Sequence, residues 1–280
     1  MSSSIRKPAV AGQFYPANPS VLRKTIEECF LHEIGPKKLL PVEGSKVIGL
    51  ICPHAGYIYS GPVAAHSYLA LSAIASYDLI IILGPNHYGI GSGIAVPAAK
   101  AWQTPLGEVS IAKDASEDLV ETSGIIDIDD LAHIQEHSIE VQVPFLQYIF
   151  NKPFKILPVS MLFQDKKTAI DVGEAVAQVA MKWKAFIIAS SDLTHYEPHD
   201  VASKKDQQLI KAIENLDVDA HYETLRKINI TACGYGPIAA VMTASKILGA
   251  RNGTLLQYAT SGDTGGNKNS VVGYAAMSFS

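Results

Sequence analysis

The sequence contains few cysteines, no long apolar segment and no excess of basic residues. Its 280 residues include three cysteines, Cys29, Cys52 and Cys233, a set too small and too odd in number for a disulfide framework. No run approaches the roughly 18 consecutive apolar residues of a membrane-spanning helix, and residues 1–16 lack the basic and apolar segments of a secretory signal. We therefore expect a cytoplasmic protein that does not cross a membrane.

The composition also argues against nucleic acids and nucleotides as ligands. The chain has 23 Lys and Arg against 27 Asp and Glu, a formal net charge of −4, and its aromatic residues are not interleaved with basic ones as in a base-stacking surface. Its glycines do not form a dinucleotide or P-loop pattern between a strand and a helix. We expect no nucleic-acid partner and no nucleotide cofactor.

Short β-branched runs alternate with longer amphipathic stretches along the chain. The runs predict buried strands at 46–51, 79–83, 154–159, 186–189, 254–259 and 271–277. Apolar residues at spacings of three and four predict helices at 22–30, 63–74, 139–150, 169–181, 204–213 and 238–248. Turn-forming residues predict loops at 84–93 and 261–270. This alternation predicts an α/β fold with one domain over residues 1–280 and a mostly parallel or mixed central sheet flanked by helices.

Three of the predicted strands are followed by a histidine: His54, His87 and His195. Because the carboxyl ends of parallel strands lie at one edge of a sheet, we expect these histidines to converge. Asp192, three residues before His195, is suited to orienting an imidazole and equally to ending its strand in an Asx-turn. The alternative for each histidine taken alone is a loop side chain with a satisfied hydrogen bond.

Cys233 and His137 are further candidates for the same site. Cys233 precedes a predicted helix, and a thiol near a helix N-terminus has a lowered pKa and ionises to a metal-binding thiolate. Imidazoles with a thiolate suit zinc, copper or iron. The alternative for Cys233 is a small buried apolar residue. His137 opens the predicted helix 139–150, where it is either a cap or a proton carrier in the same cavity.

At these residues the sequence resembles the Memo family, also called AmmeMemoRadiSam system protein B. The motifs that carry the resemblance are RKPAVAGQFYP at 6–16, PHAGY at 53–57, LGPNH at 83–87, EHSIE at 136–140, SSDLTH at 190–195 and CGYGP at 233–237. The resemblance implies a fold similar to the catalytic subunit of class III extradiol dioxygenases. It also implies partners among AMMECR1-type and radical SAM proteins.

The same resemblance implies a site chemistry. Fe(II) or Cu would be held by His54, His87 and Cys233, and His195 would act as acid and base with Asp192 and His137 nearby. The dioxygenases have a carboxylate where this chain has Cys233. An oxidisable thiolate donates more charge, so their iron and oxygen chemistry does not transfer directly.

Three functions fit these patterns. The first is a metal-dependent redox enzyme, a non-haem iron or copper oxidoreductase. The second is a non-catalytic adaptor that captures a peptide or small molecule in the same pocket, and the third is a metal-dependent hydrolase. The side chains that we expect to line the pocket are Tyr15, Tyr57, Asn86, Tyr88 and Trp102.

Overall fold

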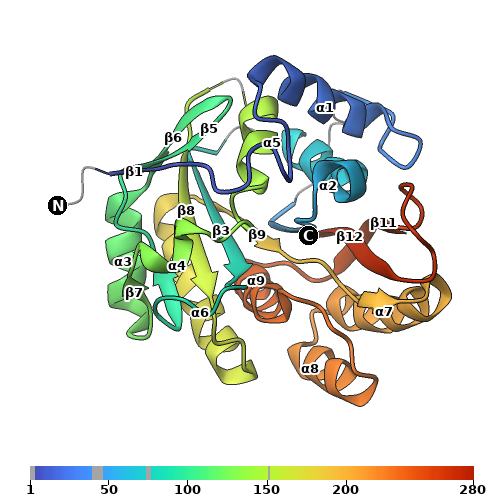
Figure 1. The fold of residues 1–280 in the computed structure, drawn as a ribbon. Coiled ribbons are helices and arrows are strands. Elements are labelled where there is room, and N and C mark those ends of the chain that lie inside the picture. The colour runs from blue at the N-terminus through green and yellow to red at the C-terminus, as the bar shows by residue number, and fades with distance from the viewer. Residues whose placement is uncertain (1–3, 40–46, 74–76, 151) are drawn as a thin grey trace.

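Four parallel strands form the centre of the sheet in the computed structural model, which describes residues 4–39, 47–73, 77–150 and 152–280 (Figure 1). In spatial order these strands are β8 (Lys155–Met161), β3 (Leu79–Pro85), β9 (Phe186–Ser190) and β2 (Gly49–Cys52). Each is short, rich in Ile, Leu or Val, and largely buried, as expected for strands covered on both faces. Strand β9 therefore lies between β2 and β3, which precede it in the chain.

Shorter strands extend the sheet on both sides. Beyond β8 lie β6 (Gly107–Ile111), β5 (Ala101–Thr104) and β1 (Ile5–Arg6), while β4 (Ile94–Val96) pairs with β8 and β7 (Asp127–Ile128). Beyond β2 lie β12 (Val271–Phe279) and β10 (His195–Glu197), and β11 (Gly253–Thr260) also pairs with β12. Because β12 runs antiparallel to β2, the sheet is mixed, and the predicted α/β class is confirmed.

Helices cover both faces of the sheet because alternate strand residues point to opposite sides. Ile80 and Ile82 pack in the core shared with α1 (Pro19–Leu31), α2 (Tyr57–Ser72) and α5 (Gln142–Ile149). Ile81 and Leu83 pack in the core shared with α3 (Lys113–Ser123), α6 (Lys166–Trp183) and α9 (Tyr235–Ile247). None of the helices in the described ranges combines the length and apolarity needed to cross a bilayer.

Several predicted boundaries differ from the observed ones. The predicted helix at 139–150 begins only at Gln142, because residues 138–141 form turns, so His137 precedes α5 rather than opening it. Gly84 and Pro85, predicted as loop residues, extend β3. Lys46 and Ile74, the ends of two predicted segments, lie outside the described residues.

Some elements were absent from the predicted set. They are α3, α4 (Leu131–Ile134), α8 (Val218–Lys227), the strands β1, β4 to β7, and β10. Helix α7 (His199–Glu214) begins five residues before the predicted 204–213. Helix α8 fully buries only His221; its apolar side chains Val218, Tyr222 and Leu225 are only partly buried, and they form a short stripe among many charged residues. The missed strands contain two to five residues, too few for a clear alternation.

Candidate metal centre

The carboxyl ends of β2, β3 and β9 bring the predicted histidines to one edge of the sheet. Cys52 at the end of β2 pairs with Ser190 at the end of β9, so the loops that follow these strands begin side by side. His54 lies two residues beyond β2, and His87 lies two residues beyond β3. The predicted convergence of these loops is therefore present.

Three donor groups that can bind a transition metal lie close together at this edge. One ring nitrogen each from His54 and His87, with Sγ of Cys233, lie within 4.8 Å of one another. The Cys233 Sγ atom is 3.1 Å from Nε2 of His54. The His54 and His87 rings lie 5.3 Å apart between centroids and are nearly perpendicular, at 83°. Two imidazoles and one thiol within this span are a donor set that suits a single transition-metal ion.

One hydrogen bond of the ring and one of the backbone hold His54 in place. Its Nδ1 lies 2.9 Å from the hydroxyl of Ser190, and its backbone N–H donates to Asp192 Oδ1 at 2.8 Å. Burial, followed by the nearby imidazoles of His87, His137 and His195, holds the pKa of His54 well below its ordinary value. The ring is therefore neutral near pH 7, the state in which imidazole binds a metal.

Glu136 orients the second imidazole. Its Oε1 lies 2.9 Å from Nδ1 of His87, and its Oε2 accepts the backbone N–H of His87 at 2.6 Å. Burial opposes ionisation of Glu136, but its contacts with His87 outweigh burial and lower the pKa of this carboxyl to about 2. An ionised carboxylate accepts a hydrogen bond from Nδ1–H of His87, which leaves Nε2 free to bind a metal.

The environment of Cys233 differs from the prediction. Cys233 lies just before Gly234, the N-cap of α9, as predicted. However, burial and then the Asp192 carboxylate raise the pKa of the Cys233 thiol, so the predicted lowering is wrong. The backbone N–H of Asp192 donates to Sγ at 3.3 Å and favours the thiolate. This hydrogen bond lowers the pKa by less than burial and the Asp192 carboxylate raise it. A metal cation beside Sγ would supply the charge that stabilises the thiolate, so this donor set fits a metal.

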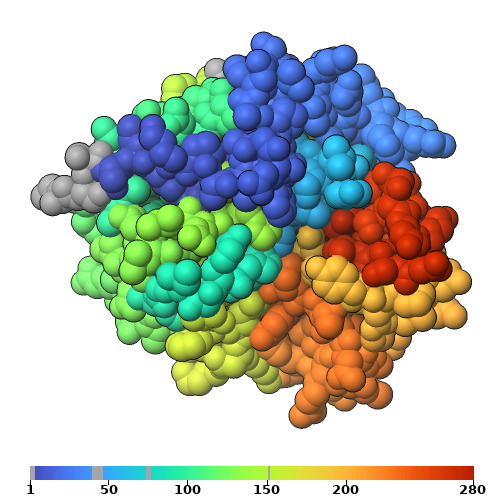
Figure 2. Space-filling view, in the orientation of Figure 1, coloured from blue at the N-terminus to red at the C-terminus, as the bar shows by residue number. Residues whose placement is uncertain are grey.

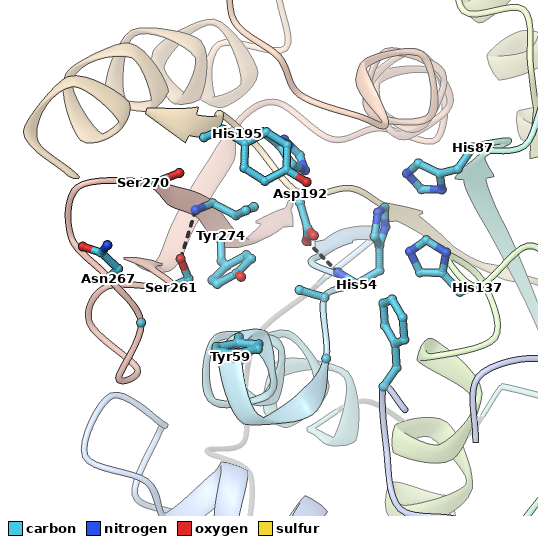
Figure 3. A pocket seen from close by; sticks show the side chains of 16 residues that line it. His54, Tyr59, His87, His137, Asp192, His195, Ser261, Asn267, Ser270 and Tyr274 are labelled. Carbon is cyan, nitrogen blue, oxygen red and sulfur yellow. Dashed lines mark hydrogen bonds between the residues drawn. The ribbon is translucent and has the colours of Figure 1, made fainter. Parts of the chain in front are cut away.

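His137, Asp192 and His195 lie around the three donors (Figure 3). The His137 ring stacks on His87 with centroids 4.7 Å apart, and burial lowers its pKa to about 4. Burial raises the pKa of Asp192 to about 6. The carbonyls of Leu193 and Thr231 lie 2.7 Å and 2.9 Å from Nδ1 of His195, so Nδ1 carries the proton and Nε2 is the acceptor.

A cavity of about 580 Å³ opens beside these side chains. In Figure 3 His54, His87 and His137 lie at one end, Ser261, Asn267 and Ser270 lie at the other, and Tyr59 and Tyr274 lie between them. Figure 2 shows the blue N-terminal segment and the red β11–β12 region on the same face of the molecule. The lining residues are Phe14, His54, Ala55, Gly56, Tyr59, His87, His137, Asp192, His195, Tyr196, Ser261, Gly266, Asn267, Ser270, Val272 and Tyr274.

The side chains predicted to line the pocket are not among the described residues that line this cavity. Tyr15, Tyr57 and Trp102 are almost fully buried in the core. The Asn86 side chain donates to the carbonyl of Ile90 and accepts the backbone N–H of Tyr88 and Gly89, so it shapes its own loop. Tyr88 is exposed.

Several lining residues were not predicted from the sequence. Phe14 packs against His137 with ring centroids 4.5 Å apart, and Tyr59 and Tyr274 lie on α2 and β12. The end of the cavity opposite the histidines is formed by the turn-rich segment 261–270, which was predicted as a loop but not connected with the histidines. Tyr57 and Tyr59 are two residues apart on α2 and therefore lie on different faces of the helix: Tyr57 is buried, whereas Tyr59 is 41% exposed and lines the cavity.

Comparisons with a family model and with individual proteins point to the same family. A family model described as "Memo-like protein" matches residues 6–278. A MEMO1 family protein of Methanopyrus kandleri is 49% identical over 98% of both chains. Another, of Methanothermobacter thermautotrophicus, is 50% identical over 98% of this chain and 100% of its own.

A solved structure shares the fold at low sequence identity. It is the crystal structure of an uncharacterized protein from Escherichia coli K12, which covers 83% of this chain and 99% of its own with a TM-score of 0.59. Its sequence identity is 15%, so the likeness bears on the architecture alone.

Proposed function

The chain belongs to the Memo family, and we propose that it is a metal-dependent redox enzyme in which His54, His87 and Cys233 hold an iron or copper ion. The observation that supports this proposal is the meeting of two imidazole nitrogens and one sulfur within 4.8 Å. Both imidazoles are tied at Nδ1, to Ser190 and to Glu136, which leaves Nε2 available on each ring.

A bound ion would supply a Lewis acid and an electron acceptor or donor at the end of the cavity. The protein supplies the surroundings. His195 has a proton fixed on Nδ1 by the carbonyls of Leu193 and Thr231. Its Nε2 is therefore suited to taking a proton from a substrate and returning it. Asp192 holds the His54 loop through the backbone N–H of His54.

The test is the metal content of the protein purified without oxygen. We expect about one iron or copper ion per chain in the wild type, and little metal in Cys233→Ala and His54→Ala. Cys29→Ala is the matched control, because Cys29 is a buried thiol that contacts the carbonyl of Tyr57 and is absent from the ligand group. Unchanged metal loading in both ligand variants would refute the proposal.

The size of the cavity favours a second candidate, capture of a peptide or small ligand without turnover. The cavity extends from the histidines to the polar side chains of Ser261, Asn267 and Ser270, well beyond what one ion needs. Binding that survived removal of the metal, with no oxidised product, would favour this alternative. A substrate screen under nitrogen separates hydrolysis from both, because hydrolysis needs no oxidant.

A further inference from the structure

The hydroxyl of Ser190 has three hydrogen-bond partners and a single proton. Its Oγ lies 2.6 Å from the carbonyl oxygen of Ser138, 2.7 Å from Nε2 of Gln142 and 2.9 Å from Nδ1 of His54. Ser138, Gln142 and Ser190 are all fully buried. All hydrogen-bond partners of this hydroxyl named here are protein groups, so the direction of each bond can be assigned by counting donors and acceptors.

The carbonyl of Ser138 settles where the proton of Ser190 goes. A carbonyl oxygen only accepts, so the Ser190 hydroxyl donates its one proton to Ser138. Its two lone pairs remain for the other two partners. The Oγ atom therefore accepts from His54, and Nδ1 of His54 must carry a proton.

The amide of Gln142 cannot reverse this assignment. Its Nε2 also lies 3.0 Å from the carbonyl of Pro53, and its Oε1 accepts the hydroxyl of Tyr68. Because the Pro53 carbonyl only accepts, the nitrogen of the amide must face it. Gln142 consequently donates to Ser190 and offers it no acceptor.

We propose that Ser190 is a positioning residue that sets the tautomer of His54 for metal binding. This inference rests on the proposed metal site. With the proton on Nδ1, the lone pair of Nε2 faces the region of Cys233, whose Sγ is 3.1 Å away. In the other tautomer a hydrogen on Nε2 would point at Sγ and occupy the position that the ion needs. Ser190 thus joins the buried face of α5 to a metal ligand through one hydroxyl.

The tautomer is measured directly by nitrogen-15 NMR of the histidine rings in the protein without added metal at pH 7. The His54 signals are assigned by their loss in His54→Asn. We expect the Nδ1–H form in the wild type and in Ser116→Ala, a control that removes another buried hydroxyl, on α3. In Ser190→Ala we expect Nε2–H to appear. A wild-type ring protonated on Nε2, or an unchanged tautomer in Ser190→Ala, would overturn the inference.

Titration with Co²⁺ under nitrogen gives the second measurement. The absorption of cobalt bound to a thiolate reports occupancy of Cys233, and we expect Ser190→Ala to bind Co²⁺ about 10- to 100-fold more weakly than Ser116→Ala. If the wild type binds Co²⁺ strongly and the two variants have equal affinity for it, the proposed role of Ser190 is refuted while the metal site itself stands. Absence of Co²⁺ binding by the wild type would instead refute the metal site, and the NMR result would still decide the tautomer.

Discussion

The buried carboxylate of Glu140 provides a quantitative test of how the N-terminal segment is held. Glu140 forms an ion pair with Arg6 at 2.6 Å, and both side chains are at least 94% buried. It also accepts the backbone N–H groups of Ala9 and Val10, at 2.8 Å and 3.0 Å, and the hydroxyl of Tyr15 at 2.6 Å. Substitution Glu140→Gln keeps the size of this side chain and removes its charge.

The expected loss follows from the burial of the pair. Removing one partner of a buried ion pair costs about 3–5 kcal/mol, because the other charge is left without compensation. In Glu140→Gln the amide nitrogen also meets N–H donors where a carboxylate oxygen accepted them. We expect the free energy of unfolding to fall by about 3 kcal/mol or more, which for a chain of this size lowers the melting temperature by roughly 6–12 °C.

Urea denaturation at pH 7 followed by circular dichroism measures this loss. The matched control is Glu28→Gln, which removes the partner of Lys24 in an ion pair whose side chains are 63% and 76% exposed. Exposed pairs contribute about 0–1 kcal/mol, so the control should stay close to the wild type. A loss below about 1 kcal/mol in Glu140→Gln would contradict the assignment of Glu140 as the anchor of the N-terminal segment.

Two further variants test buried polar groups elsewhere. Burial lowers the pKa of His221 to about 4. Between about pH 4 and pH 6.5 the His221 imidazole is therefore neutral in the folded protein, whereas in the unfolded chain it takes up a proton. The unfolding free energy should therefore decrease as the pH falls from about 6.5 to 4, by up to about 1.4 kcal/mol per pH unit. In His221→Phe this slope should be shallower by the contribution of one titrating proton, as measured by urea denaturation at several pH values. An unaltered slope would contradict the neutral state of His221. In Gly273→Ala the new Cβ would lie 1.9 Å from Oδ2 of the buried Asp206, so we expect a loss of about 1–3 kcal/mol. Gly56→Ala, whose Cβ would meet nothing nearer than 3.6 Å, should lose much less, and equal melting temperatures for the two variants would contradict the close contact.

The sequence was informative about the strands that carry the site. Residues 79–83 and 186–189 are apolar runs whose side chains are buried on both faces only in a sheet covered on both sides. They form the central strands β3 and β9. Since such strands are parallel, the placement of His54, His87 and His195 after the carboxyl ends of three predicted strands implied a shared edge. The architecture and the meeting of these side chains could therefore be anticipated.

The surroundings of these side chains depend on contacts that no local pattern encodes. The partners of the two imidazoles, Ser190 and Glu136, are polar residues whose roles follow from the register of distant segments. The pKa of Cys233 depends on burial and on Asp192, which outweigh its position before a helix. Phe14 reaches the cavity because Glu140, far along the chain, holds the residues on either side of it.

The place of β9 in the sheet has a consequence for the order in which the donor groups of the proposed metal site come together. The ribosome makes β2 and β3 first, but in the finished protein β9 separates them, so the two histidine loops gain their mutual spacing only after residues 186–190 have emerged. Cys233 is synthesised later, and β12, the other neighbour of β2, is made after Cys233. If His54, His87 and Cys233 hold an ion as proposed, a nascent chain could bind it with all three donors only after residue 233 has been made.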